Sequence, residues 1–341
     1  MRNILVTGAA GFIGANFVRM LAGRGENVRL IAFDKLTYAG NLANVQDVVD
    51  EERVLFVRGD ICDPDVVAGT FRDYDINEVV NFAAESHVDR SILGSGPFVQ
   101  TNVVGTQVLL DIAKANNVNK FLQVSTDEVY GTLPEDKPEV KFTEETPLAP
   151  NSPYSASKAA SDCLVRSYFH TFHMPVLTTR CSNNYGPYQF PEKAIPLFVT
   201  NLMEGKKIPL YGDGMNVRDW LYVEDHCQAI WTVLNKGTFG EVYNIGGNNE
   251  MTNRKIVETV LHEMGKSWDE GVQYVKDRPG HDRRYAIDAS KIKNELGWEP
   301  KFRFESAIKT TINWFRENQQ WWRAIKSGEY LKYYETQYAG R

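Results

Sequence analysis

The sequence has few cysteines, no long apolar run and no excess of basic residues. Its four cysteines, Cys62, Cys163, Cys181 and Cys227, lie far apart and form no C-x-x-C pair, which argues against a secreted disulfide scaffold. No stretch approaches the roughly 20 apolar residues of a membrane helix, and the N-terminal residues lack the apolar core of a signal peptide. Acidic residues outnumber basic ones, 44 to 38, so overall charge does not favour nucleic acid as a partner. We therefore expect a cytoplasmic protein that binds neither membrane nor nucleic acid.

The composition and the order of apolar runs indicate a large α/β protein. The chain has 341 residues, 43% of them hydrophobic, which is enough for two domains or one domain with a large appendage. Short β-branched runs alternate with helical patterns, and runs of this kind are typical of strands buried on both faces. The expected strands are Ile4–Thr7, Val28–Phe33, Val54–Val57, Glu78–Phe82, Phe121–Ser125 and Val176–Arg180, and the expected helices are Ile13–Leu21, Val103–Ala115 and Tyr154–Phe172. This alternation predicts a doubly wound parallel sheet of the Rossmann-like kind.

The second half of the chain has a different character. After about Cys181 it becomes richer in proline, glycine and aromatic residues, which predicts a smaller and more irregular lobe of mixed α/β structure. Further helices are expected at Asp225–Leu234, Arg254–Met264 and Phe304–Asn318, and a strand at Val242–Ile245. The predicted domains are residues 1–182, with a return to the main sheet at about 219–246, and a smaller domain of residues 183–218 and 247–341.

Three glycines follow the first expected strand at once, with the spacing Gly8-x-x-Gly11-x-x-Gly14. This differs from the G-x-G-x-x-G fingerprint, but it meets the same need for a tight turn and a close backbone approach to a pyrophosphate. A helix that begins near Phe12 would point its N–H groups and positive dipole end at the phosphates. A purely structural turn is the alternative.

Acidic residues follow the second and third strands. Asp34 ends the second strand about twenty residues after the glycines, where a carboxylate binds the adenosine ribose hydroxyls and repels a 2′-phosphate. NAD is therefore the expected cofactor, although the neighbouring Lys35 weakens the preference over NADP. Asp60 and Ile61 follow the third strand and are placed near the adenine, with a solvated loop aspartate as the alternative for Asp60.

A tyrosine and a lysine lie four residues apart near the start of an expected helix. Tyr154 and Lys158 would share one helix face, and an ammonium beside a phenol favours the phenolate. Tyr154 is therefore a candidate general base for a hydroxyl group. By itself, the spacing also occurs on ordinary helix surfaces.

Two adjacent carboxylates, Asp127 and Glu128, follow the fifth strand directly, after Thr126. Neighbouring carboxyl groups discourage each other's ionisation, so one can remain a protonated acid while the other acts as a base. At the ligand end of a parallel sheet, this pair indicates acid–base chemistry beside a cofactor.

Together these motifs resemble the extended short-chain dehydrogenase/reductase superfamily, in its sugar-nucleotide-modifying branch. The resemblance rests on the glycine motif, Asp34, the segment 81–84 and the Tyr154/Lys158 pair. Within this branch, the segments 84–91, 125–131, 180–188 and 277–285 are closely similar to the dTDP-glucose 4,6-dehydratase family. The similarity covers essentially the whole chain; Ala10 stands where the family often carries another glycine.

The resemblance implies a hydro-lyase of deoxysugar biosynthesis, a homodimer that retains NAD and converts dTDP-glucose to dTDP-4-keto-6-deoxyglucose. Tyr154, poised by Lys158 near Thr126, would take the proton of the sugar 4-hydroxyl as C4 is oxidised. Glu128 would remove the C5 proton, and Asp127 would protonate the departing C6 hydroxyl. Reduction at C6 would then complete a redox-neutral cycle.

The family pattern also implies two sets of ligand-binding residues. The cofactor side comprises Gly8, Gly11, Phe12, Ile13, Gly14, Asp34, Lys35, Leu36, Thr37, Asp60, Ile61, Ala83, Ala84, Ser86, His87, Thr101, Tyr154, Lys158 and Asn184. The nucleotide-sugar side comprises Ser86, Thr126, Glu128, Asn183, Lys193, Pro209, Tyr211, Arg218, Asn253, Asp277, Arg278 and His281. Arg218 is the candidate for the pyrophosphate, with a surface arginine as the alternative. No metal site is expected, because His170 and His173 have no accompanying ligands.

Several alternatives stay open at this point. A UDP- or CDP-glucose 4,6-dehydratase is one, because a single methyl group separates thymine from uracil. A nucleotide-sugar 4-epimerase shares the tyrosine and lysine but needs no acid at C6, and a UDP-sugar decarboxylating enzyme is a related candidate. A non-enzymatic NAD-binding scaffold or regulator is the remaining one, although such proteins commonly lose the residues that are present here.

Overall fold

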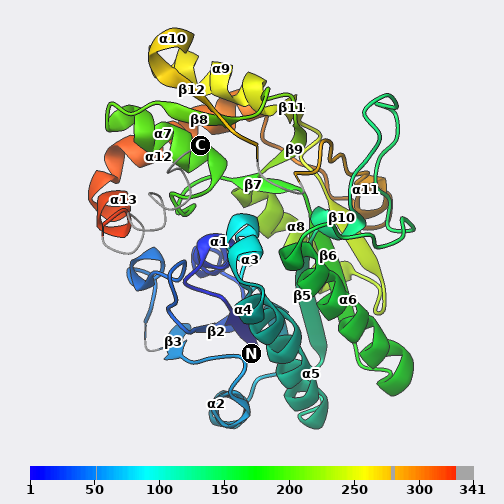
Figure 1. Cartoon of the computed structure of the whole chain (residues 1–341). Coiled ribbons are helices and arrows are strands. Elements are labelled where there is room, and N and C mark those ends of the chain that lie inside the picture. Colours follow the sequence, from blue (N-terminus) through cyan, green and yellow to red (C-terminus); the bar gives the residue numbers. More distant parts are fainter. Residues whose placement is uncertain (51, 278–280, 328–341) are drawn as a thin grey trace.

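The computed structural model describes residues 1–50, 52–277 and 281–327, and its centre is a seven-stranded sheet (Figure 1). The strands run in the order β10-β6-β5-β4-β1-β2-β3, and all neighbours are parallel. Their bounds are β1 Arg2–Thr7, β2 Val28–Asp34, β3 Val54–Arg58, β4 Glu78–Asn81, β5 Lys120–Thr126, β6 Val176–Cys181 and β10 Val242–Ile245. The winding reverses between β1 and β4, so the predicted doubly wound parallel sheet is confirmed.

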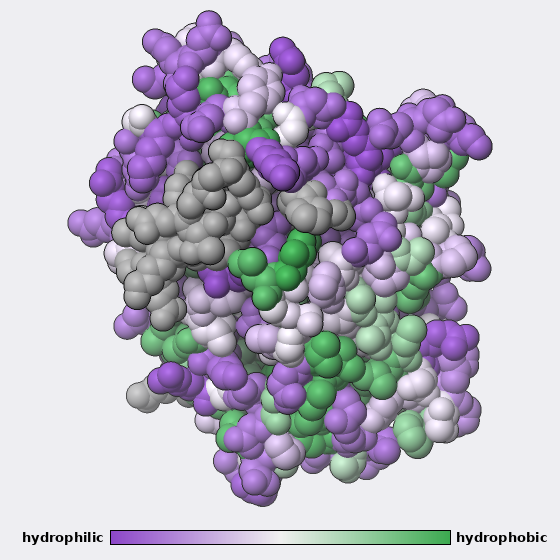
Figure 2. Space-filling view, in the orientation of Figure 1, coloured by the Kyte–Doolittle hydropathy of each residue, from purple (hydrophilic) through white to green (hydrophobic). Residues whose placement is uncertain are grey.

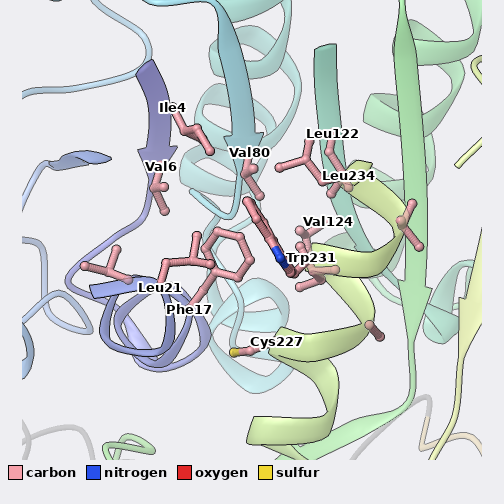
Figure 3. Packing of buried hydrophobic residues seen from close by; sticks show 14 of the residues in the cluster. Ile4, Val6, Phe17, Leu21, Val80, Leu122, Val124, Cys227, Trp231 and Leu234 are labelled. Atoms are coloured by element: carbon pink, nitrogen blue, oxygen red, sulfur yellow. The ribbon is translucent and has the colours of Figure 1, made fainter. Parts of the chain in front are cut away.

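Helices cover both faces of this sheet and bury its β-branched strands. On one face lie α1 (Phe12–Ala22), α8 (Val223–Lys236) and α11 (Ser290–Leu296); on the other lie α2 (Pro64–Tyr74), α5 (Thr106–Ala115) and α6 (Pro153–Phe172). Figure 3 shows how the first face is filled: Phe17 of α1 and Trp231 of α8 lie next to Val80 of β4. The ring centroids of Phe17 and Trp231 are 6.5 Å apart.

Short helical segments connect the main elements near the ligand end of the sheet. They are η1 (Leu42–Asn44), α3 (Val88–Leu93), α4 (Gly96–Phe98), the π-helical η2 (Val99–Gly105) and η3 (Asp127–Tyr130). The helix expected at Val103–Ala115 is therefore a π-helical segment that continues into α5. The π-helical segment brings Gly105 against Ile61, where an added Cβ would meet the isoleucine side chain at 2.6 Å.

A second lobe lies beyond the carboxyl ends of the strands and has its own core. It contains a three-stranded sheet, in the order β11-β9-β7, and the parallel pair β12-β8. The strands are β7 Asn183–Tyr185, β8 Ile208–Tyr211, β9 Val217–Tyr222, β11 Glu250–Thr252 and β12 Val272–Val275; the helices are α7 Ala194–Met203, α9 Asn253–Glu263, α10 Trp268–Gly271, α12 Phe304–Glu317 and α13 Gln319–Ile325. In α12, Phe304, Ile308, Thr311 and Phe315 fall at helical spacing and are all buried, so this face of the helix packs into the core of the second lobe.

No helix in the described part of the chain is both long and apolar enough to cross a bilayer. α2 and α7 are not among the predicted helices, although the N-terminus of α2 has clear start signals. Asp63 caps it by accepting from the backbone N–H groups of Asp65 and Val66, and Pro64 occupies its first turn.

Candidate active site

A cavity of about 340 Å³ runs along the carboxyl ends of the main-sheet strands. It is lined by residues that follow β1 through β6 and by the first turns of α6. All five predicted catalytic residues, Thr126, Asp127, Glu128, Tyr154 and Lys158, line this cavity. So do the predicted cofactor residues Gly8, Gly11, Phe12, Ile13, Gly14, Asp34, Lys35, Thr37, Asp60, Ile61, Ala83, Ala84, Ser86, Thr101 and Asn184. Parallel strands end at one edge of the sheet, which is why segments far apart in sequence meet here.

The backbone of the glycine loop leaves no room for a side chain at Gly8 or Gly14, as a pyrophosphate cradle requires. Gly8 has φ +66°, and an added Cβ would lie 2.8 Å from the backbone nitrogen of Ala83. A Cβ on Gly14 would lie 2.2 Å from the carbonyl oxygen of Gly8. The helix that follows begins at Phe12, with Gly11 as its extended N-cap, so its first N–H groups face the cavity end of the sheet.

The end of the cavity that is predicted to bind the adenosine carries the acidic residue expected for NAD. The carboxylate of Asp34 accepts hydrogen bonds from the backbone of Ala10 at 2.9 Å and of Leu36 at 2.8 Å. Lys35 forms an ion pair with Asp60 at 2.6 Å, which holds the pKa of Asp60 below its ordinary value despite partial burial. The lysine charge is thereby partly neutralised, so Asp34 dominates the electrostatics of this end.

At the other end of the cavity, Tyr154 and Lys158 lie on the buried face of α6. The helix begins with a capping box between Ser152 and Ser155, which places Tyr154 in its first turn. Burial raises the pKa of Tyr154 well above its ordinary value, Glu128 raises it further, and hydrogen bonding with Thr126 opposes this. The ammonium of Lys158 donates to the carbonyl oxygen of Val124 at 2.7 Å.

The carboxyl group of Asp127 is buried at the start of η3, whereas Glu128 is only partly buried. Thr126 caps η3 by accepting from the backbone N–H of Glu128 at 3.3 Å. Oδ2 of Asp127 has no hydrogen-bond partner among the described residues. Burial raises the pKa of Asp127 well above its ordinary value, and the charges of Glu128 and Asp219 raise it further, while Arg218 lowers it. A carboxyl group whose protonated form is favoured, next to a second carboxyl group, is an arrangement that can supply an acid and a base.

A second cavity of about 180 Å³ adjoins the first and extends into the second lobe. It is lined by the predicted substrate residues Glu128, Asn183, Lys193, Pro209, Tyr211, Arg218, Asn253 and His281. Glu128, Asn183 and Lys193 line both cavities, so the two form one site that joins the lobes. The guanidinium of Arg218 lies 4.1 Å from the ring centroid of Tyr285 and donates to the backbone carbonyl of Asp282 at 2.7 Å.

A few predicted site residues lie elsewhere. Leu36 lines neither cavity, and His87, predicted on the cofactor side, lines the second cavity. Asp277 also lies outside both linings, but its carboxylate is 2.6 Å from Nδ1 of His281. Ser86 and Thr126, predicted for the substrate as well, line the first cavity only. Arg278 lies outside the described residues.

Three residues that sequence reasoning missed, Glu192, Ala194 and Trp220, line both cavities. Glu192 is buried and accepts from the guanidinium of Arg90 at 3.1 Å. That guanidinium in turn lies 4.0 Å from the ring centroid of Tyr38, so Arg90 links α3 to two loops around the site. Nothing in the sequence indicates that a single glutamate in a loop rich in proline and aromatic residues is buried. Its neighbour Lys193, by contrast, was predicted to bind the nucleotide-sugar.

Comparisons with known proteins agree with this geometry. The model of the family described as GDP-mannose 4,6 dehydratase matches residues 5–311. A dTDP-glucose 4,6-dehydratase of Xanthomonas campestris pv. campestris is 53% identical over 347 residues, which cover 97% of each chain. The crystal structure of the Bacillus anthracis dTDP-glucose 4,6-dehydratase in complex with NAD is 53% identical, with a TM-score of 0.89 over 96% of this chain and 100% of that one. The Streptomyces venezuelae enzyme of the same name, also with NAD bound, is 49% identical with a TM-score of 0.90 over 95% and 100%.

Proposed function

The chain belongs to the dTDP-glucose 4,6-dehydratase family, and from this premise we propose which of its residues carry each step of the reaction. It is an NAD-dependent hydro-lyase that converts dTDP-glucose to dTDP-4-keto-6-deoxyglucose and water. The observation that carries the proposed roles is the buried carboxyl of Asp127, which lies beside Glu128 in the cavity that also holds Tyr154 and Lys158.

The residues of the first cavity fit NAD. The backbone of the Gly8–Gly14 loop would hold the pyrophosphate, and Asp34 would bind the adenosine ribose hydroxyls. When bound, NAD supplies the acceptor and later the donor of one hydride, so the overall reaction is redox-neutral. The chain's own residues have to move protons and hold the sugar over the cofactor.

In the first step, Tyr154 takes the proton of the sugar 4-hydroxyl. Its phenolate is costly in a buried site, because burial raises the pKa of Tyr154. The ammonium of Lys158 and the positive charge of oxidised nicotinamide both favour that phenolate. We therefore expect Tyr154 to lose its proton only in the complete complex, when these charges are in place.

In the second step, Glu128 removes the C5 proton that the new 4-ketone has acidified, and Asp127 protonates the departing C6 oxygen. Burial and the charge of Glu128 raise the pKa of Asp127, which favours the protonated form that this acid needs. This acid is what separates a dehydratase from a 4-epimerase, which eliminates nothing at C6.

The assay follows from this difference. Incubation with dTDP-glucose is expected to give a 4-ketose that absorbs in alkali, with no net formation of NADH. Stoichiometric NADH, or dTDP-galactose as the product, would contradict the assignment. UDP-glucose and CDP-glucose serve as matched substrates, and we expect both to react less well than dTDP-glucose.

We also propose that the two lobes divide the ligands. Residues 1–182 and about 219–246 would form the NAD-binding domain, and residues 183–218 and 247–341 the nucleotide-sugar-binding domain, of which 278–280 and 328–341 lie outside the described residues. Packing of Ile292 and Leu296 with the core of the main sheet supports moving α11 to the first domain.

The four cysteines, none of them in a disulfide, support a reducing cytoplasm as the site of action.

A homodimer is our proposal for the assembly. Apolar residues gather on the face that carries α3, α4 and α6 (Figure 2), where Leu93 is 65% and Val99 51% exposed. Exposed Ala156 and Cys163 on α6 are small enough to let a second copy's helix approach closely. Val99→Glu is expected to give monomers in analytical ultracentrifugation. Val66→Glu, at an exposed residue of α2, is the control and is expected to leave the dimer intact.

A further inference from the structure

One turn of α6 beyond Lys158 lies a buried carboxylate that has no role in the steps described above. Asp162 follows Lys158 by four residues, so the two side chains share one face of the helix, and both are buried. Oδ2 of Asp162 accepts a hydrogen bond from Nε of Arg180 on β6 at 2.9 Å. Oδ1 of Asp162 is buried and has no hydrogen-bond partner among the described residues.

Arg180 is itself held by Tyr130 of η3. Its Nη1 donates to the Tyr130 hydroxyl at 2.9 Å, and that hydroxyl donates to Oδ1 of Asn244 at 2.8 Å. The guanidinium also lies 4.9 Å from the centroid of the Tyr130 ring. These contacts fix the Arg180–Asp162 pair between α6 and the sheet, so Asp162 is held in place whatever the charge on Lys158.

The charges in this cluster do not cancel. Two buried cations, Lys158 and Arg180, face one buried anion, Asp162, which leaves one net positive charge, the charge that a phenolate at Tyr154 would neutralise. Lys158 donates its hydrogen bond to the neutral carbonyl of Val124, which provides no counter-charge. If Asp162 were neutral, two like charges would be buried together with no anion, which is costly.

We propose that Asp162, clamped by Arg180, is the counter-charge that keeps the buried Lys158 ammonium protonated for the reaction. Asp162 is thus a positioning residue, and this role rests on those proposed above for Tyr154 and Lys158. Burial lowers the pKa of Lys158, and Asp162 and then Cys181 act in the opposite direction. The titratable and charged groups around this lysine are Tyr154 and Asp162 on α6, Arg180 and Cys181 on β6, and Asp127, Glu128 and Tyr130 in η3.

The test uses Asp162→Asn, whose amide oxygen can still accept from Arg180. Oxidation at C4 is isolated with dTDP-6-deoxyglucose, which has no C6 hydroxyl to eliminate, and is followed by the absorbance of enzyme-bound NADH. Removing the anion lowers the pKa of Lys158, so the alkaline limb of this step is expected to move about one to two pH units lower. Competitive acetylation of Lys158, read by mass spectrometry, is expected to show its midpoint moving by the same amount.

Tyr130→Phe is the matched control, because it removes a hydrogen bond from the same cluster without changing any charge. It is expected to leave both the alkaline limb and the acetylation midpoint of Lys158 where they are in the wild type. A uniform loss of rate in Asp162→Asn with an unshifted limb, or an equal shift in Tyr130→Phe, would overturn the proposal.

Two further measurements keep the outcome clear. Asp162→Ser, which leaves room for water beside Arg180, is the second neutral variant if Asp162→Asn does not fold, and the same shift is expected from it. Turnover of dTDP-glucose by the wild type is measured alongside. If the wild type turns over dTDP-glucose but the neutral variants show no shift of the alkaline limb, the role of Asp162 is refuted and the proposed function stands. If the wild type does not turn over dTDP-glucose, the proposed function itself is contradicted.

Discussion

Nδ1 of His226 on α8 lies 2.8 Å from Oδ1 of Asn184, and this contact fixes the state of both side chains. The amide nitrogen of Asn184 donates to the carbonyl of Ser182 at 2.9 Å, so its oxygen must be the atom that faces the imidazole. His226 therefore carries its proton on Nδ1, and its buried Nε2 is an acceptor with no partner among the described residues. The histidine thereby fixes the side chain of Asn184, which lines the first cavity.

Acid is expected to destabilise the fold through this histidine. Burial lowers the pKa of His226 from 6.5 to about 3. Below pH 6.5 the imidazole of His226 is protonated in the unfolded chain, whereas in the folded protein it stays neutral down to about pH 3. Protonation therefore favours the unfolded chain, and stability is lost as the pH falls through this window. The loss is about 1.4 kcal/mol per pH unit, and about 2 kcal/mol at pH 5.

His226→Asn isolates this effect, because an asparagine nitrogen can replace the Nδ1–H donor and does not titrate. Urea unfolding at pH 7, 6 and 5 is expected to show a flatter decline in the free energy of unfolding for the variant. The buried carboxyl groups are common to both proteins and cancel in the difference. Identical slopes would show that His226 does not hold this pKa in the folded state.

Asp127→Asn is expected to separate the two halves of the reaction. The asparagine cannot donate a proton to the C6 oxygen, so loss of water is expected to slow by about a hundredfold or more. Oxidation at C4 and proton removal at C5 do not need this acid. Deuterium exchange from solvent into C5 is therefore expected to continue while water release falls; an equal fall in both would contradict the role of Asp127.

Gly14→Ala is expected to damage the NAD site. The new Cβ would lie 2.2 Å from the carbonyl oxygen of Gly8, a backbone atom that cannot move away cheaply. We expect a loss of about 1–3 kcal/mol in stability and a lower NAD content per chain after gel filtration. Gly25→Ala is the control, since a Cβ there meets nothing within 4 Å. This variant is expected to keep the stability and the NAD content of the wild type.

Phe17→Ala tests the packing beneath the sheet. Phe17 is fully buried, and its ring centroid lies 5.3 Å from that of Phe82. The cavity left behind is expected to cost about 3–5 kcal/mol in the free energy of unfolding. Phe172→Ala, at a residue that is 48% exposed, is expected to cost far less, and similar losses in chemical denaturation of the two variants would contradict this packing.

Much of the main sheet could be predicted from the sequence, because strands buried on both faces consist of nearly continuous apolar runs. The strand predicted at Val242–Ile245 has those bounds in β10, although it joins the sheet after a long excursion of the chain. The glycine loop, Asp34 and the Tyr154/Lys158 pair follow strands or open a helix, so their position along the chain was enough to bring them to one cavity.

The second lobe was harder to predict from the sequence, because its strands are short and the roles of its polar residues depend on tertiary contacts. Glu192, for example, forms an ion pair with Arg90, which lies about a hundred residues away in the sequence. The same holds in the first lobe, where the sequence does not distinguish Asp162 from other polar residues of its helix and only the fold places Arg180 of β6 against it. Periodicity can predict which face of a helix is buried, but not which charged residue on that face will meet a partner.

The helices beneath the sheet have a consequence for protein engineering. α8 and α11, which complete the core around Phe17, are separated in the chain by β11, α9 and β12 of the second lobe. A fragment that stops at Ser182 would keep α1 but lack Trp231 and Ile292, and would expose part of this face of its sheet to water. A hybrid enzyme that takes its substrate specificity from a relative must therefore splice in several separate segments, since no single crossover point divides the two lobes.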